Sequence, residues 1–126
     1  MPAQIFRGSC AGIFAVCQSS EIFYLTKDEI VKINKLVCDT AQEIHKNGGR
    51  KMMIVSSGHT ADTIEEQAAN FCELAESGTE ALIWITNRLD INNEGDDMWI
   101  ANADKLLKLL PKNVKLGLYQ GRHGRL

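Results

Sequence analysis

The chain has 126 residues, of which 14 are Lys or Arg and 16 are Asp or Glu, so its formal net charge at pH 7 is −2. This near balance offers no basic surface for nucleic acid or an anionic membrane, and no apolar run reaches the roughly 18 to 20 residues that span a bilayer. We expect residues 1–126 to form a single unit, although a closed eight-stranded α/β barrel typically needs roughly 250 residues. The first residues lack the pattern of a secretory signal, which predicts a cytoplasmic protein.

The potential metal ligands of the chain are scattered. The cysteines at positions 10, 17, 38 and 72 include no Cys-x-x-Cys pair, and no histidine lies four residues from another ligand. Neither a disulfide framework nor a zinc site is indicated by these spacings. We therefore predict buried free thiols, no metal site and no cofactor.

The first predicted strand is the apolar run Gly12–Val16, which is typical of a strand buried on both faces in a parallel sheet. A polar turn follows, and Thr26 with Glu29 then fits the capping box that begins a helix. The expected apolar face of this helix comprises Ile30, Ile33, Leu36, Val37, Ala41 and Ile44, and Gly48-Gly49 ends it.

The same unit is predicted to repeat twice more. The second strand is Met52–Val55, followed by a helix that Asp62 caps and that buries Ile64, Ala68, Phe71, Cys72 and Ala75. The third strand is Ala81–Ile85, followed by a polar loop over 86–95 and a helix that buries Trp99, Ala103, Leu106, Leu107 and Leu110. The fourth strand is Val114–Tyr119.

These strands begin roughly 30 to 40 residues apart, a spacing that requires parallel strands with helical, right-handed crossovers. The predicted class is therefore α/β. In such folds ligands bind beyond the carboxyl ends of the strands, whether the sheet is a barrel or doubly wound.

Two polar features lie at those carboxyl ends. Gln18, Ser19 and Ser20 follow the first strand and offer hydroxyls, an amide and backbone N–H groups to a carboxylate or phosphate, but a plain turn with capping side chains needs the same residues. Tyr119 ends the fourth strand, where its phenol could relay a proton or simply pack. Both interpretations of each feature remain open on position alone.

Taken in order, these turns resemble those of the dihydrodipicolinate synthase and N-acetylneuraminate lyase family of pyruvate-dependent class I aldolases. The family pattern Gly-Thr-Thr-Gly-Glu, then Leu-Ser or Leu-Thr, is similar to Cys17–Glu21 followed by Leu25-Thr26. Further similar segments are Ser57–Ala61 after the second strand, Glu94-Gly95 before the third helix, and Leu116–Tyr119 in the fourth strand. The resemblance runs from the end of the family's first helix to its fifth strand.

The resemblance implies a partial (β/α)8 TIM barrel with about four parallel strands and three helices. It also implies a carbon–carbon lyase or synthase that binds pyruvate or a related 2-oxo acid and is a homo-oligomer. Gln18, Ser19 and Ser20 would bind the carboxylate, and Tyr119 would take part in the proton relay. The family's Schiff-base lysine lies on a sixth strand, to which no residue of this sequence corresponds, so we expect this chain alone to be inactive.

A second interpretation comes from a different class of protein. The chain could be a non-catalytic α/β binding or interaction module, with two copies covering each other as a dimer of half-barrels. In both interpretations an arc of four strands exposes its edges and its inner face unless another chain covers them.

Overall fold

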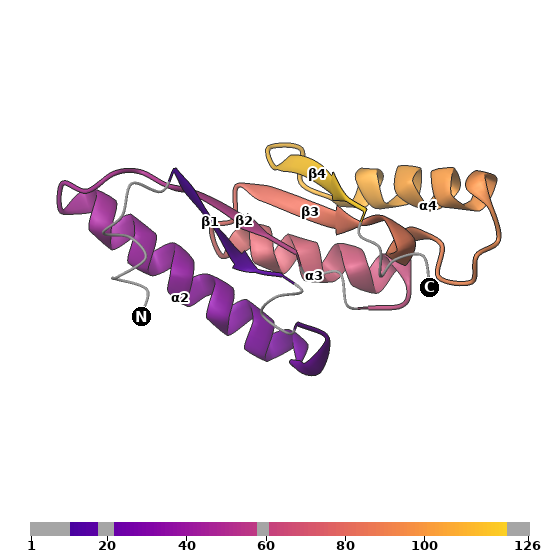
Figure 1. Cartoon of the computed structure of the whole chain (residues 1–126), viewed down its shortest axis with the longest axis horizontal. Coiled ribbons are helices and arrows are strands. Elements are labelled where there is room, and N and C mark those ends of the chain that lie inside the picture. Colours follow the sequence, from indigo (N-terminus) through magenta and orange to yellow (C-terminus); the bar gives the residue numbers. More distant parts are fainter. Residues whose placement is uncertain (1–10, 18–21, 58–60, 121–126) are drawn as a thin grey trace.

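The computed structural model describes residues 11–17, 22–57 and 61–120. Four parallel strands form one sheet: β1 (Gly12–Val16), β2 (Met53–Ser56), β3 (Ala81–Ile85) and β4 (Lys115–Tyr119). The spatial order is β1-β2-β3-β4, so each strand pairs with the strand that precedes it in the chain (Figure 1). β2 and β4 each begin one residue later than the sequence predicted.

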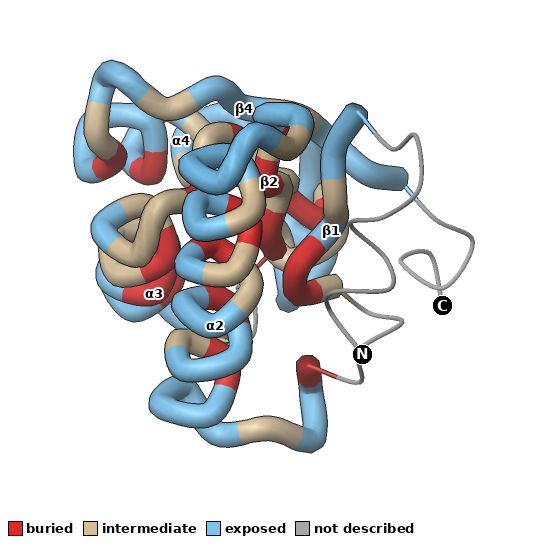
Figure 2. Tube along the Cα trace, turned by 90° about the vertical axis from the view of Figure 1, so that its left-hand side faces the viewer, coloured by how far each residue is buried: buried red, intermediate tan, exposed pale blue. Residues whose placement is uncertain are grey.

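Three helices alternate with these strands: α2 (Lys27–Lys46), α3 (Ile64–Glu76) and α4 (Asp96–Leu109). They lie together on one side of the strands, as Figure 2 shows. A sheet whose strand order never reverses, with all helices on one face, is part of a barrel, because a doubly wound sheet has helices on both faces. The predicted partial TIM-barrel fold with four parallel strands and three helices is confirmed.

The register of the sheet separates its helix-facing side from its inner side. Paired residues of parallel strands point to the same face, and successive residues alternate between the faces. Leu82 and Trp84 of β3 are buried in the core beneath the helices, so their partners Leu116 and Leu118 also face outward. Ile83 and Ile85, with their partners Gly117 and Tyr119, therefore lie on the inner face.

The first capping box is formed as predicted. The Glu29 N–H donates to the Thr26 hydroxyl over 3.2 Å, and the Thr26 N–H donates to the Glu29 carboxylate over 2.9 Å. These reciprocal bonds satisfy two amides that a helix start leaves without a partner.

The predicted cap of the second helix is wrong by one residue. The N-cap of α3 is Thr63, whose hydroxyl accepts from the Glu66 N–H over 3.2 Å. Asp62 instead accepts a hydrogen bond from Arg88 over 3.1 Å. Threonine and aspartate are both favourable N-cap residues. Asp62 is engaged in the ion pair with Arg88, and Thr63 caps α3.

The buried face of α2 also differs from the expected one. Ile33 and Leu36 are exposed, whereas Asn34 and Cys38 are buried beside Ile30 and Ala41. The buried face of α2 is therefore centred on a different side of the helix from the expected one and includes the polar Asn34, because Asn34 has hydrogen-bond partners inside the protein. Apolar periodicity alone could not place an asparagine in the core.

β1 and α4 are less buried than predicted. Phe14 of β1 is 45% exposed, and Leu107 of α4 is also exposed. The predicted burial of β1 on both faces is wrong, because β1 is an edge strand that pairs with β2 alone in the described part of the chain. Leu118 of β4, the strand at the other edge, is 62% exposed. The predicted polar loop over 86–95 contains a short 3-10 helix, η3 (Thr86–Leu89), whose Leu89 is fully buried.

Candidate functional site

The carboxyl ends of the four strands form one edge of the sheet. β1 ends at Val16, β2 at Ser56, β3 at Ile85 and β4 at Tyr119. The loops that follow the first three strands also lead into α2, α3 and α4, so the helix N-termini lie toward this edge. Barrel enzymes build their active sites at this edge.

The predicted carboxylate-binding residues Gln18, Ser19 and Ser20 lie outside the described residues. The strand that leads into them is well anchored, because Val16 is fully buried and its carbonyl accepts from the Ser57 N–H over 2.8 Å. The turn after β1 therefore starts beside the end of β2.

Tyr119 lies at the carboxyl end of β4 on the inner face. It pairs in register with the buried Ile85 of β3, and 49% of its own surface is exposed. A half-exposed phenol on the inner face at this edge is accessible to a small molecule. Its position fits the role that the sequence predicted but does not test that role.

Ser57 is a polar residue of this edge that the sequence analysis did not single out as a binding residue. It is 2% exposed, and its hydroxyl has no hydrogen-bond partner within residues 11–17, 22–57 and 61–120. Ser57 follows β2 and lies two residues after the inner-facing Val55, so strand alternation places it on the inner face as well. The alternation of side chains along β2 could have indicated an inward-facing serine. Because Ser56 and Ser57 are adjacent, the sequence did not show which of them faces inward, and in the structure Ser56 faces the helices.

Arg88 and Gln67 hold the loops of this edge together. The Arg88 guanidinium donates to the Ala61 carbonyl over 2.9 Å and to Asp62 over 3.1 Å. The buried Gln67 amide donates to the carbonyls of Ala61, over 3.1 Å, and Arg88, over 3.0 Å. The Arg88 guanidinium carbon also lies 5.8 Å from the centre of the Phe23 ring. These contacts join all three described loops of the edge.

A second polar cluster lies on the helix-facing side and serves packing. Ser56 donates to the side-chain carbonyl of Asn34, and the Asn34 amide donates to the Thr79 hydroxyl over 2.8 Å. The Ser56 and Thr79 hydroxyls are 2.9 Å apart. Burial raises the pKa of the neighbouring Cys38 thiol above its ordinary value of 9.0, so this thiol is a poor nucleophile.

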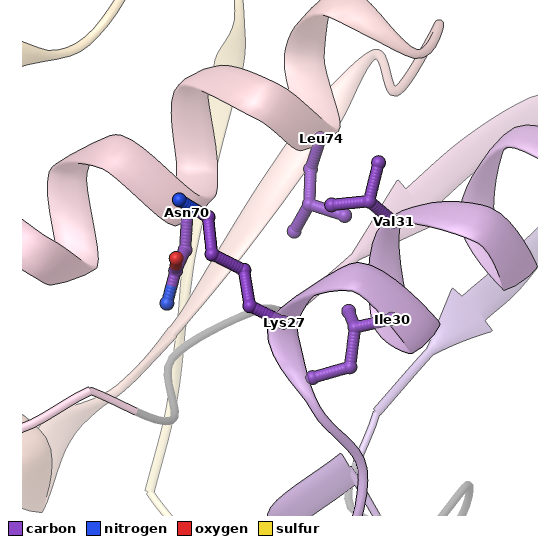
Figure 3. A pocket seen from close by; sticks show the side chains of 5 residues that line it. All are labelled: Lys27, Ile30, Val31, Asn70 and Leu74. Atoms are coloured by element: carbon purple, nitrogen blue, oxygen red, sulfur yellow. The ribbon is translucent and has the colours of Figure 1, made fainter.

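A small pocket lies between α2 and α3 (Figure 3). Its volume is about 10 Å³, which is room for about one water molecule. Its lining residues are Lys27, Ile30, Val31, Asn70 and Leu74. The pocket is too small for an organic substrate, so the sheet edge remains the candidate site.

Within residues 11–17, 22–57 and 61–120, no group of three or more His, Cys, Asp or Glu side chains is arranged to hold a metal ion. In the same part of the chain, no helix combines the length and the apolar character that crossing a bilayer requires.

The fold defined by this sheet is that of a (β/α) barrel in part. A solved structure with this fold, described as a crystal structure of dihydrodipicolinate synthase, superposes on the chain with a TM-score of 0.77 at 19% sequence identity. The match covers 97% of this chain and 38% of that chain. No protein-family model matches the sequence, and no curated protein matches it. The structural likeness establishes the fold.

Proposed function

We propose that the chain forms the 2-oxo acid-binding part of a barrel of the pyruvate-dependent class I aldolase type. Gln18, Ser19 and Ser20 bind the carboxylate of pyruvate or a related 2-oxo acid, and the Tyr119 phenol hydrogen-bonds to its keto oxygen. Residues 1–126 act as one unit, and the working form is a homo-oligomer. The reaction class of the complete site is carbon–carbon bond cleavage or formation.

One observation carries the proposal: the strand that leads into the Gln18–Ser20 turn and the strand that ends in Tyr119 share the carboxyl edge of one singly wound sheet. The similarity to the dihydrodipicolinate synthase structure supports it at the level of fold.

This chain alone binds the 2-oxo acid without forming an imine. A Schiff base requires a lysine at the ligand. Lys115 starts β4 four residues before Tyr119, which places it roughly 13 Å away along the strand, at the opposite edge of the sheet. Lys27 is engaged in an ion pair with Glu73 between α2 and α3, over 2.9 Å.

Titration with pyruvate, followed by the backbone amide signals in NMR spectra, tests the proposal. We expect saturable shifts at residues 18–20 and 119, and a Kd raised about 100-fold or more by the double substitution Ser19→Ala and Ser20→Ala, since each of the two lost hydrogen bonds to a charged group is worth about 1.5 kcal/mol or more. Tyr119→Phe should weaken binding, whereas Tyr24→Phe, which alters an exposed tyrosine, is the matched control.

Two further outcomes decide the chemistry. Pyruvamide, which has no carboxylate, should cause no saturable shift, and equal binding of pyruvamide would contradict a carboxylate site. Treatment with pyruvate and borohydride should leave the mass of the chain unchanged. A stoichiometric adduct at one lysine would refute binding without imine formation.

A non-catalytic interaction module is the second candidate function. The small volume of the α2–α3 pocket and the exposed apolar side chains of β1 and β4 favour it. A chain that fails to bind pyruvate but associates through these strands would belong to this class.

A further inference from the structure

Within the described residues the sheet is open at both ends, and its two edge strands carry few of the features that protect an edge: β1 has one irregularity of register, between Phe14 and Val16, and β4 has one charged residue. β1 pairs only with β2, and β4 only with β3, in the described part of the chain. Natural edge strands are usually protected by charged residues, proline or bulges. β1 contains no charged residue, and β4 has one, Lys115, at its amino end.

The face of β4 that looks toward the helix layer is also uncovered. Leu116 and Leu118 are 42% and 62% exposed, although their register partners Leu82 and Trp84 are buried. The cover provided by α3 and α4 therefore stops at β3. On the inner face, Phe14 and Tyr119 are each nearly half exposed.

Both edges of the sheet direct backbone groups away from their neighbouring strand in the described part of the chain. The Lys115 N–H donates to the Glu80 carbonyl over 3.0 Å, on the β3 side. Since successive residues of a strand direct their N–H groups to opposite sides, those of Leu116 and Leu118 point to the open edge. In β1 the Ala11 carbonyl accepts from the Met53 N–H over 3.0 Å, so the groups of Gly12 point away from β2.

We propose that a second copy of this chain covers these surfaces, with β4 of each copy pairing in parallel with β1 of the other. The described residues of each chain supply four sequentially ordered parallel strands, so those of two copies supply eight, the number that closes a (β/α) barrel. A two-fold axis along the barrel makes the two β4–β1 junctions identical, and both strands have five residues. The inner faces of the two sheets, which carry Phe14, Val55, Ile83 and Ile85, then pack against each other.

This inference rests on the sheet, not on the proposed ligand.

The substitution Leu118→Pro tests the pairing. Proline removes an N–H that points to the open edge and leaves the bonds to β3 intact, since Lys115, Gly117 and Tyr119 donate on that side. The matched control is Leu118→Ala, which keeps the N–H and shortens the side chain. Light scattering coupled to size-exclusion chromatography gives the mass, and sedimentation across concentrations gives the Kd.

We expect the unmodified chain to be a dimer and Leu118→Pro to raise its Kd by at least about 30-fold, because one edge hydrogen bond is lost at each of two junctions. Leu118→Ala should remain dimeric at concentrations where Leu118→Pro is monomeric. Far-ultraviolet circular dichroism shows whether Leu118→Pro keeps its helices. If it unfolds, Leu116→Pro, which acts on the same edge, replaces it.

A monomeric unmodified chain at tens of micromolar would overturn the proposal. So would a dimer whose Kd is the same in Leu118→Pro and Leu118→Ala, since its interface would lie elsewhere, or a larger open-ended assembly. Pyruvate binding is measured separately by NMR, so failure of the dimer and failure of the ligand site are distinguishable.

Discussion

The buried side chain of Asn34 shows how one polar residue fixes the position of a helix. It links α2 to Ser56 at the end of β2 and to Thr79 before β3. A buried polar group is tolerated only where its hydrogen bonds are satisfied, so this contact selects one rotation of α2 over the apolar alternative.

We predict that Asn34→Ala lowers the free energy of unfolding by about 3 kcal/mol, because it leaves a cavity and two buried hydroxyls with one partner fewer. Urea denaturation measures this change, with the exposed Asn92→Ala as the control. In a double-mutant cycle with Ser56→Ala we expect a coupling of about 1 kcal/mol. Additive effects would mean that the hydrogen bond contributes nothing to stability.

At the scale of the element, the start of α2 depends on a reciprocal cap. Hydrogen bonds from Thr26, first from its backbone N–H, lower the pKa of Glu29 below its ordinary value of 4.5. A carboxyl whose pKa is lower in the folded state stabilises the fold above pH 4.5, and this contribution is lost as the pH falls through the lowered pKa.

Glu29→Gln should therefore flatten the dependence of stability on pH below about 4.5. Thr26→Ala should lower the free energy of unfolding by about 1 kcal/mol at neutral pH, whereas Thr26→Ser keeps the hydroxyl and should have little effect. Thermal unfolding followed by circular dichroism between pH 3 and 7 measures both changes. Parallel pH curves for Glu29→Gln and the unmodified chain would contradict the assigned role of the carboxylate.

The sequence predicted the elements well because hydrophobic periodicity, capping residues and glycine ends are local signals. It failed where a tertiary contact made the choice, as when Arg88 engaged Asp62 and left the cap of α3 to Thr63. The same holds for the candidate site. Tyr119 could be predicted from its place at a strand end, but the buried hydroxyl of Ser57 depends on which face of β2 each of two adjacent serines occupies.

At the scale of the whole molecule, the proposed closure of the open sheet by a second copy would make stability depend on protein concentration. Only folded chains can associate into a closed barrel, so association raises the free energy of unfolding by mass action. We predict that the unfolding temperature rises with protein concentration for the unmodified chain. The same measurement on Leu118→Pro should show a rise that begins only at higher concentrations, and equal rises over the same concentrations would contradict the assigned junction.

The uncovered leucines of β4 also bear on the life of the chain in a cell. An apolar strand with free backbone groups is what chaperones retain and what aggregates recruit, so an unassembled copy is exposed to both fates. Its steady-state abundance would then follow how quickly it meets its partner after synthesis. At low expression levels the amount of folded protein would fall more steeply than the rate of synthesis, because degradation of the single copies competes with their assembly.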